Sequence, residues 1–377
     1  MARYLRWLAT TGCELGSYQE AWRWSVTDLE GFWGSIWQYF SVRGHTPSDR
    51  VLTNPEMPGA TWFPGATLNY AEHALARRDG HPAVIYASET QGPATLSAAD
   101  LASAVGAAAA GFRRLGVRRG DRVAAYLPNV PEALIAFLAT ASLGAVWSSC
   151  APEFGTRSVV DRFRQIEPTL LVAADGYRYG GRPFDRRAEV DEIRRQLPSL
   201  QAVVGVEVLG AWGKDDSVVA WDDLLDTGGT APALEFEPVP FDHPLWILYS
   251  SGTTGVPKAI VQGHGGILLE HLKALSLHLD LGPADRFFWF SITGWMMWNM
   301  LIGGLLVGAG VVLYDGSPVY PDPAALWRLA EQSGITYFGT SAPYLVACMK
   351  AGLRPRDSYD LSRLRGVGST GAPLPAE

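Results

Sequence analysis

The stretch SSGTTGVPK, residues 250–258, has the residue types that bind phosphate. Its hydroxyl groups come from four residues, Ser250, Ser251, Thr253 and Thr254. Gly252 and Gly255 allow the chain to turn its backbone N–H groups toward one point, and Lys258 adds a cation on a flexible stem. Donors gathered around one concave point suit an anion, so we expect this loop to hold the phosphates of a nucleotide.

The chain before the loop indicates where such a site would lie. Residues 244–251, PLWILYSS, predict a buried strand, and open α/β sheets bind ligands beyond the carboxyl ends of their strands. The loop is not a Walker A motif, because Gly255 is followed by Val256 and Pro257 before Lys258. A P-loop kinase is therefore excluded. An ordinary solvated turn is the alternative for any cluster of Ser, Thr and Gly.

Strands and helices alternate on the amino-terminal side of the loop. PAVIYA, residues 82–87, predicts a strand, and residues 96–116 predict a helix with Ser97 as its N-cap and Gly116 at its end. DRVAAYLPN, residues 121–129, predicts the next strand, and the rhythm continues to about residue 206. This β-α-β pattern predicts a mostly parallel sheet covered by helices.

The alternation resumes beyond a polar, acidic segment rich in Gly and Pro, residues 207–240. We expect strands over 285–291 and 335–341, and helices over 265–278 and 323–334.

Residues 295–314 are apolar over about the length of a membrane helix. Asn299 and several glycines interrupt this stretch, so we expect a turn followed by a short buried strand and no membrane span.

Three units follow from these patterns. Residues 1–75 carry six of the fourteen tryptophans without regular spacing, which is typical of a segment that wraps onto another domain. We call these residues the aromatic-rich cap. Residues 76–240 and 241–377 are the expected first and second α/β subdomains, and the second carries the phosphate loop.

Charge and cysteine content exclude other classes. The net charge of −7 and the pI near 5.6 disfavour nucleic-acid binding. Cys13, Cys150 and Cys348 lie far apart without metal-ligand spacing, so neither a disulfide framework nor a zinc site is expected. The amino-terminal residues do not have the pattern of a signal peptide. A reducing cytoplasm is the expected compartment.

SSGTTGVPK resembles the phosphate loop of the adenylate-forming superfamily, which reads Ser/Thr-Gly-Ser/Thr-Thr-Gly-x-Pro-Lys, and this match favours binding over a solvated turn. Residues 62–75, 120–148 and 368–375 are also similar to superfamily segments. The resemblance implies an α/β fold, the large amino-terminal domain of stacked α/β subdomains with mostly parallel sheets. No match to the small carboxyl-terminal domain and its catalytic Lys is found, so we expect residues 1–377 to be incomplete at the carboxyl end and inactive alone.

Residues 257–266 and 291–299 depart from acetyl-CoA synthetases and resemble acetoacetyl-CoA synthetases. The implied reaction joins acetoacetate to ATP as acetoacetyl-AMP, then transfers the acyl group to CoA, releasing AMP and pyrophosphate. One alternative is a synthetase for acetate, propionate or another short acid. An alternative of another class is a non-catalytic nucleotide-binding module.

The resemblance also implies roles for residues. Lys258, Thr253 and Thr254 are the implied catalytic residues, holding the β- and γ-phosphates with Gly255 while Mg²⁺ bridges phosphate oxygens. The rest of the phosphate cradle is Ser250, Ser251 and Gly252, and the adenine turn is Gly371, Ala372 and Pro373. The implied acyl pocket is formed by Trp295, Met296, Met297, Asn299 and Thr370. For this Met/Trp stretch core packing is the alternative, and His264 is expected to be a hydrogen-bonded structural residue.

Overall fold

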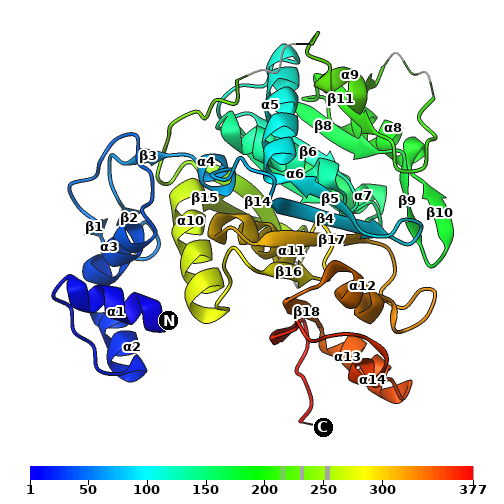
Figure 1. Cartoon of the computed structure of the whole chain (residues 1–377). Coiled ribbons are helices and arrows are strands. Elements are labelled where there is room, and N and C mark those ends of the chain that lie inside the picture. Colours follow the sequence, from blue (N-terminus) through cyan, green and yellow to red (C-terminus); the bar gives the residue numbers. More distant parts are fainter. Residues whose placement is uncertain (214, 216, 230–232, 251–254, 377) are drawn as a thin grey trace.

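The structure is a computed structural model that describes residues 1–213, 215, 217–229, 233–250 and 255–376. Two sheets dominate it (Figure 1). The larger, seven-stranded sheet has the order β12 (Val219–Ala220), β11 (Ala202–Val206), β8 (Leu170–Ala174), β6 (Arg122–Tyr126), β7 (Val146–Cys150), β14 (Pro244–Ser250) and β15 (Lys258–Gly263). Its neighbouring strands are parallel except for the pair β14 and β15.

The second sheet has six strands. Their order is β19 (Gly366–Thr370), β18 (Tyr337–Ser341), β16 (Arg286–Trp289), β17 (Gly310–Asp315), β4 (Pro82–Ser88) and β5 (Ala94–Ser97). Only β4 and β5 are antiparallel. The mostly parallel α/β architecture predicted from the sequence is confirmed.

Helices separate the two sheets and cover their outer faces. A single core cluster joins the inner faces of both sheets through the central helices α4 (Tyr70–Ala74), α5 (Ala98–Arg114), α6 (Pro131–Ser142), α10 (His264–Leu272) and α11 (Met296–Ile302). The outer face of the larger sheet packs on α7 (Thr156–Phe163) and α8 (Arg187–Gln196), and that of the smaller sheet on α12 (Ala325–Ser333) and α13 (Ala342–Lys350). The sheets and helices therefore form five layers.

The local signals at α5 act as predicted. The Ser97 side chain accepts a hydrogen bond from the N–H of Asp100 at 3.1 Å, which satisfies one free donor of the first turn. Gly116, two residues beyond the helix, has φ of +91°, a value that side chains disfavour. The N-cap and the glycine thus set the two ends of this helix.

The apolar residues 295–314 do not form one helix. They divide into α11, a 3₁₀ turn over Gly303–Val307 and the buried strand β17, as expected from their glycines. Within the described residues, no helix is both long and apolar enough to cross a membrane.

Shorter elements complete the chain. They are α1 (Ala2–Thr10), α2 (Tyr18–Thr27), α3 (Leu29–Tyr39), β1 (Leu52–Asn54), β2 (Thr61–Trp62), β3 (Thr67–Leu68), β9 (Gly176–Tyr179), β10 (Arg182–Asp185), α9 (Trp221–Leu225), β13 (Val239–Pro240), a π-helical turn (Lys273–His278) and α14 (Pro355–Ser358). The predicted helix over 265–278 thus consists of α10 and the π-helical turn.

The predicted boundaries at residues 75 and 240 remain a prediction about folding units. The two sheets interleave the chain across them. Strands β4 and β5, from the amino-terminal half, join the smaller sheet, whereas β14 and β15, beyond residue 240, join the larger one. Each sheet therefore needs both segments in order to form.

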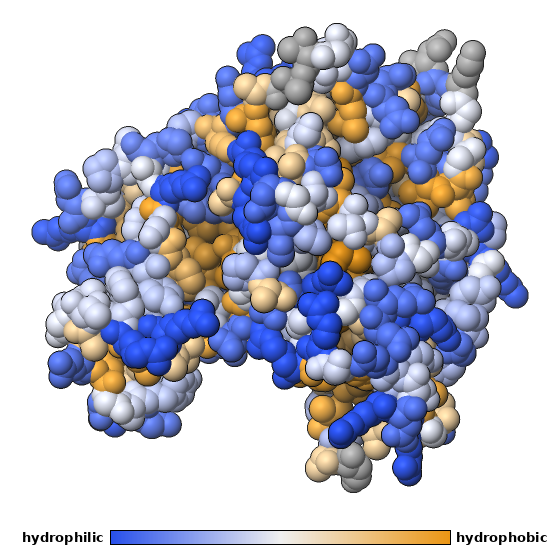
Figure 2. All heavy atoms as spheres, viewed as in Figure 1, coloured by the Kyte–Doolittle hydropathy of each residue, from blue (hydrophilic) through white to orange (hydrophobic). Residues whose placement is uncertain are grey.

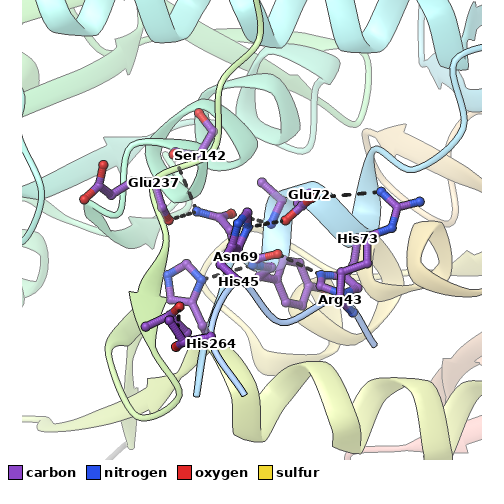
Figure 3. Close-up of polar contacts among 12 residues, drawn as sticks. Arg43, His45, Asn69, Glu72, His73, Ser142, Glu237 and His264 are labelled. Carbon is purple, nitrogen blue, oxygen red and sulfur yellow. Dashed lines mark hydrogen bonds and ion pairs between the residues drawn. The ribbon is translucent and has the colours of Figure 1, made fainter. Parts of the chain in front are cut away.

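Asn69 fastens the aromatic-rich cap to the central layer (Figure 3). It is fully buried, and its Nδ2 donates to the carbonyl oxygens of Ala141 and Glu237, each at 2.9 Å. Its Oδ1 accepts from the N–H of Ala71 at 2.9 Å and so caps α4. One side chain therefore satisfies backbone groups from three separate segments.

Apolar side chains also reach the surface around α13 and the last described residues, at the lower right of Figure 2. Met349 is 56% exposed and Leu374 is 54% exposed, and both line a hollow of about 540 Å³. This surface is distinct from the core between the sheets.

Candidate functional site

The phosphate loop connects two antiparallel strands at the edge of the larger sheet. Ser250 is the last residue of β14, Lys258 is the first residue of β15, and the two are paired across the hairpin. Gly255 has φ of +148°, a conformation that glycine tolerates. The predicted residues Ser251, Gly252, Thr253 and Thr254 lie outside the described residues. The described part of the hairpin holds Lys258, which is exposed, opposite Ser250.

Residues of α7 and its carboxyl-terminal turn support both sides of this hairpin. Gln165 Nε2 donates to the carbonyl oxygen of Pro257 at 2.9 Å, immediately before Lys258. The Tyr249 hydroxyl, immediately before Ser250, donates to the carbonyl oxygen of Arg162 at 2.9 Å. Two hydrogen bonds thus hold the ends of the loop against one helix.

The guanidinium of Arg162 extends this support toward the second predicted segment. It lies over the rings of Tyr249 and Phe154, at 5.8 Å and 5.2 Å from their centroids. Phe154 packs on Gly294, where an added Cβ would lie 3.2 Å from the ring. Gly294 therefore lets the segment that contains Trp295 approach the loop after β7.

Three hydrogen bonds fasten residues 293–298, which follow β16 of the smaller sheet, to residues of the larger sheet. Thr293 Oγ1 donates to the carbonyl oxygen of Leu127 at 2.6 Å, and Ser149 Oγ donates to the carbonyl oxygen of Thr293 at 2.6 Å. Trp298 Nε1 donates to Oδ1 of Asn129 at 3.0 Å. The segment predicted to bind the acyl group is thus held between the carboxyl ends of β6 and β7 and the end of β16.

The predicted pocket residues differ in exposure. Trp295 is 53% exposed and Met296 is 61% exposed, whereas Met297 is half-buried against the core. Asn299 is buried, and its Oδ1 has no hydrogen-bond partner within the described part of the chain. Only part of this segment is core, and the exposed part adjoins Gly294.

Thr370 and the predicted adenine turn lie at the corresponding edge of the smaller sheet. Thr370 ends β19 and pairs with Ser341, the last residue of β18. Because β16, β18 and β19 are parallel, the turn after β16 and Thr370 lie at the same edge. Gly371, with φ of +86°, Ala372 and Pro373 are exposed directly beyond it. The structure thus brings Thr370 and the segment containing Trp295 to one edge of the sheet.

His264 is part of the fold, as expected. It is fully buried at the start of α10, and its Nδ1 accepts the N–H of Tyr70 at 3.1 Å. Burial, and next the nearby His243, lower the pKa of His264 to about 3. The ring is therefore neutral near pH 7 and cannot supply charge to a phosphate.

Asn129, Ser149 and Thr293 were not identified as functional residues from the sequence. They position the predicted acyl segment through their buried hydrogen bonds. Each follows or ends a predicted strand, which is the signal that could have singled them out, but their partners lie more than 140 residues away.

No group of three or more His, Cys, Asp or Glu side chains in the described ranges could hold a metal ion.

A sequence model of the AMP-binding enzymes matches residues 71–377. The chain belongs to this family. A sequence model of the amino terminus of acetyl-coenzyme A synthetases matches residues 18–74. Most of the aromatic-rich cap is therefore similar to that amino-terminal segment. The resemblance found in the phosphate loop is confirmed at the level of the family.

Several relatives carry more specific names. The acetoacetyl-coenzyme A synthetase of Rhizobium meliloti (strain 1021) is 40% identical over 100% of this chain and 58% of its own length. The malonamoyl-CoA synthetase vrtB of Penicillium aethiopicum is 38% identical over 96% of this chain and 54% of its own length. A solved structure of acetoacetyl-CoA synthetase from Streptomyces lividans has a TM-score of 0.95 and 54% identity, covering 99% of this chain and 58% of that chain. The chain thus spans a little over half the length of these relatives.

Proposed function

We propose that the protein activates acetoacetate with ATP to acetoacetyl-AMP and transfers the acetoacetyl group to CoA, releasing AMP and pyrophosphate. The observation that carries the proposal is the 54% identity to the Streptomyces lividans acetoacetyl-CoA synthetase over 99% of the chain. It is supported by the placement of Lys258 and of the segment containing Trp295 at the carboxyl ends of the strands. Open α/β sheets bind their ligands at this edge.

The first step brings a carboxylate to the α-phosphate of ATP, so two anions must approach each other. Charge neutralisation and in-line positioning therefore matter more than a general acid or base. In this proposal Lys258, Thr253, Thr254 and Gly255 hold the β- and γ-phosphates, which leave as pyrophosphate. Ser250, Ser251 and Gly252 complete the same cradle.

Mg²⁺ accompanies ATP in this proposal and supplies charge neutralisation to the phosphates when bound. The chain's described residues offer no carboxylate cage for it. It would be held by phosphate oxygens and water, while this chain orients the phosphates through Lys258 and the hydroxyl groups of the loop.

Of the remaining predicted residues, one group would contact the nucleotide and the other would contact the acid. Gly371, Ala372 and Pro373 would approach the adenine through backbone, since Ala372 offers no polar side chain. Trp295, Met296 and Met297 would shape the acyl pocket, with Asn299 or Thr370 donating a hydrogen bond to the 3-oxo group. That polar contact would distinguish acetoacetate from acetate and propionate.

Partners of this reaction are small molecules, acetoacetate, ATP and CoA, and no nucleic acid. We place the reaction in the cytoplasm, because all three cysteines are free and two of them, Cys150 and Cys348, are buried.

ATP–pyrophosphate exchange tests the proposal in a purified protein that joins this chain to the small carboxyl-terminal domain expected from the resemblance. We expect acetoacetate to support exchange with a higher kcat/KM than acetate, propionate or 3-hydroxybutyrate, and CoA to be consumed with acetoacetate. Faster exchange with acetate or propionate would reassign the acid. Absence of exchange with every acid would instead favour a non-catalytic nucleotide-binding protein.

Malonamate is a second candidate acid. The Penicillium aethiopicum relative is named a malonamoyl-CoA synthetase, and both acyl groups carry a carbonyl on the third carbon. Malonamate therefore belongs in the same exchange assay, where a higher kcat/KM than that of acetoacetate would select it.

A further inference from the structure

A cavity of about 500 Å³ lies between α6 of the central layer and the β4–β5 hairpin of the smaller sheet. Pockets for small ligands have volumes of this order. Its walls include the apolar side chains of Val84, Leu96 and Ile135. Val130 lines the cavity and directly follows Asn129, which is hydrogen-bonded to Trp298. The cavity therefore adjoins the predicted acyl segment, but none of that segment's residues lines it.

Asp315, the last residue of β17, lines this cavity and is 7% exposed. Burial raises its pKa to about 8, and the neighbouring carboxylates of Glu153 and Glu89 contribute in the same direction. No hydrogen bond from the described residues reaches its carboxyl group. A buried carboxylate of this kind is costly unless it is protonated or paired with a cation.

Unlike Asp315, the neighbouring Glu89 has hydrogen-bond donors for its carboxylate within the chain. Its carboxylate accepts three backbone N–H groups, from Gly180, Gly181 and Ser317, each at 2.7 Å. These three bonds hold the Glu89 carboxyl group in place beside Asp315, whose pKa it helps to raise. The fold thus satisfies Glu89 from within the chain and leaves Asp315 facing open space.

Other groups on the cavity wall add to the negative potential. Glu132, near the amino end of α6, and the exposed Glu207 carry carboxyl groups, whereas Arg178 carries the cation of the lining. Burial, and next the charges of Asp315 and Glu132, raise the pKa of the Tyr86 hydroxyl, which also lines the cavity. An aromatic ring beside carboxylates is an environment that attracts an organic cation.

We propose that this cavity binds a small organic ammonium ion, with Asp315 as its counter-charge and Tyr86 as its aromatic wall. An ammonium group has three donors for the carboxyl oxygens, and its alkyl part matches Val84, Leu96 and Ile135. A bare metal ion fits less well, because no group of three or more possible ligands occurs among the described residues.

Binding displaces a proton. The protonated Asp315 carboxyl and the free ammonium ion become an ion pair and a released proton, with no other bond formed or broken. With the pKa of Asp315 near 8, almost one proton is released per ammonium bound at pH 7, and little is released at pH 9. The titratable groups that face Asp315 are Glu89, Glu153 and Tyr86, and Glu132 lines the same cavity.

The probes are propylammonium and butane-1,4-diammonium, with propionamide as the neutral control. Calorimetry in potassium chloride, combined with pH-stat titration, measures affinity and proton release together. We expect both cations to bind, propionamide not to bind, and Asp315→Asn to weaken binding about thirtyfold or more.

A second variant keeps the test independent of Asp315. Ala94 lies on the cavity wall but is exposed on β5, so Ala94→Trp fills the cavity from the outside without a change of charge. It should also abolish binding, whereas Asp49→Asn, at an exposed carboxylate outside the cavity lining, should not change it. Thermal denaturation confirms that each variant is folded.

The proposal is overturned if neither cation binds, if propionamide binds as well as the cations, or if binding survives both Asp315→Asn and Ala94→Trp. Binding at pH 7 without proton release also overturns it, because Asp315 would then not be the counter-charge. None of these results affects the proposed acid activation, which pyrophosphate exchange measures separately.

Discussion

Lys258 is the residue on which the proposed first step depends most directly. Its ammonium group stands at the start of an exposed edge strand, opposite Ser250 and directly after Pro257, whose carbonyl oxygen Gln165 holds in place. A cation positioned before the reaction stabilises developing charge on pyrophosphate without reorganisation during the step. We therefore expect Lys258 to act through its positive charge and through the fixed position of its backbone.

In a protein that also carries the small carboxyl-terminal domain, replacing Lys258 by Ala should lower the rate of acetoacetate-dependent pyrophosphate exchange by about 10²-fold, or ~3 kcal/mol, as for loss of one preorganised donor. The loss should be similar for every acid that is activated, because the loop faces the phosphates. Lys350→Ala, at an exposed lysine on α13, is the matched control and should retain the original rate. Normal exchange in Lys258→Ala would remove this residue from the mechanism.

Met297 is the residue best placed to test the acyl pocket. It is half-buried between the exposed Met296 and the buried Trp298, so shortening it should enlarge a pocket without unfolding the chain. Met297→Ala should shift the ratio of kcat/KM between acetoacetate and longer 3-oxo acids by ~1–3 kcal/mol per methylene. Met349→Ala, at an exposed methionine on α13, is the control. Equal responses of all acids would mean that Met297 is core packing.

At this scale the sequence predicts residue types better than their partners. Lys258 and Ser250 were identified because a loop of hydroxyls and glycines follows an apolar strand. Asn129 and Thr293 were not, because each gains its role from a hydrogen bond to the other sheet. Sequence spacing contains no information about which distant carbonyl a buried side chain will reach.

Single elements owe their positions to a few buried polar contacts. α4 has only five residues, too short to be stable on its own, and its N-cap Asn69 also bonds to the end of α6 and to the chain before β13. The His73 ring beyond it contacts the carbonyl oxygen of Asn69 at 2.8 Å and accepts the N–H of Arg43 at 2.9 Å (Figure 3). Helix α4 therefore positions the rest of the aromatic-rich cap.

Asn69→Ala should reduce the free energy of unfolding by roughly 2–4 kcal/mol, since two buried carbonyl groups lose their donor and α4 loses its cap. Urea denaturation measures the loss. Asn54→Ala is the matched control, because Asn54 donates to the carbonyl oxygen of Gly59 at 3.0 Å in an exposed turn and should cost under about 1 kcal/mol. Equal losses in the two variants would contradict the role assigned to Asn69.

The elements themselves were predicted where local signals are strong. α5 has an N-cap, a terminal glycine and a long apolar periodicity, and the structure confirms it. β15 was missed, because its first four residues are exposed and it gains its regular structure by pairing with β14. The interleaving of the sheets was also beyond local patterns, since pairing of β4 with β17 joins residues that are far apart in the chain.

On the scale of the whole molecule, the central layer joins the two sheets, and it contains two buried histidines. Both contact Tyr70: the N–H of Tyr70 donates to His264, and its hydroxyl lies 3.3 Å from Nδ1 of His271. Burial lowers the pKa of His264 to about 3, with His243 contributing, and burial lowers that of His271 to about 4. The folded state thus holds both rings neutral well below the pH at which an unfolded chain protonates them.

Acid should therefore destabilise the whole fold before most carboxylates titrate. Between about pH 6.5 and pH 4 the unfolded chain binds protons on both histidines that the folded chain does not bind, so the free energy of unfolding falls as the pH falls. At pH 5 the loss should be roughly 2 kcal/mol per histidine. Urea denaturation at pH 7.5, 6 and 5 measures it. His271→Leu should remove about half of this pH dependence, whereas His45→Asn, at an exposed histidine, should preserve it. If His271→Leu unfolds with the same pH dependence as the parent chain, acid sensitivity arises outside the central layer.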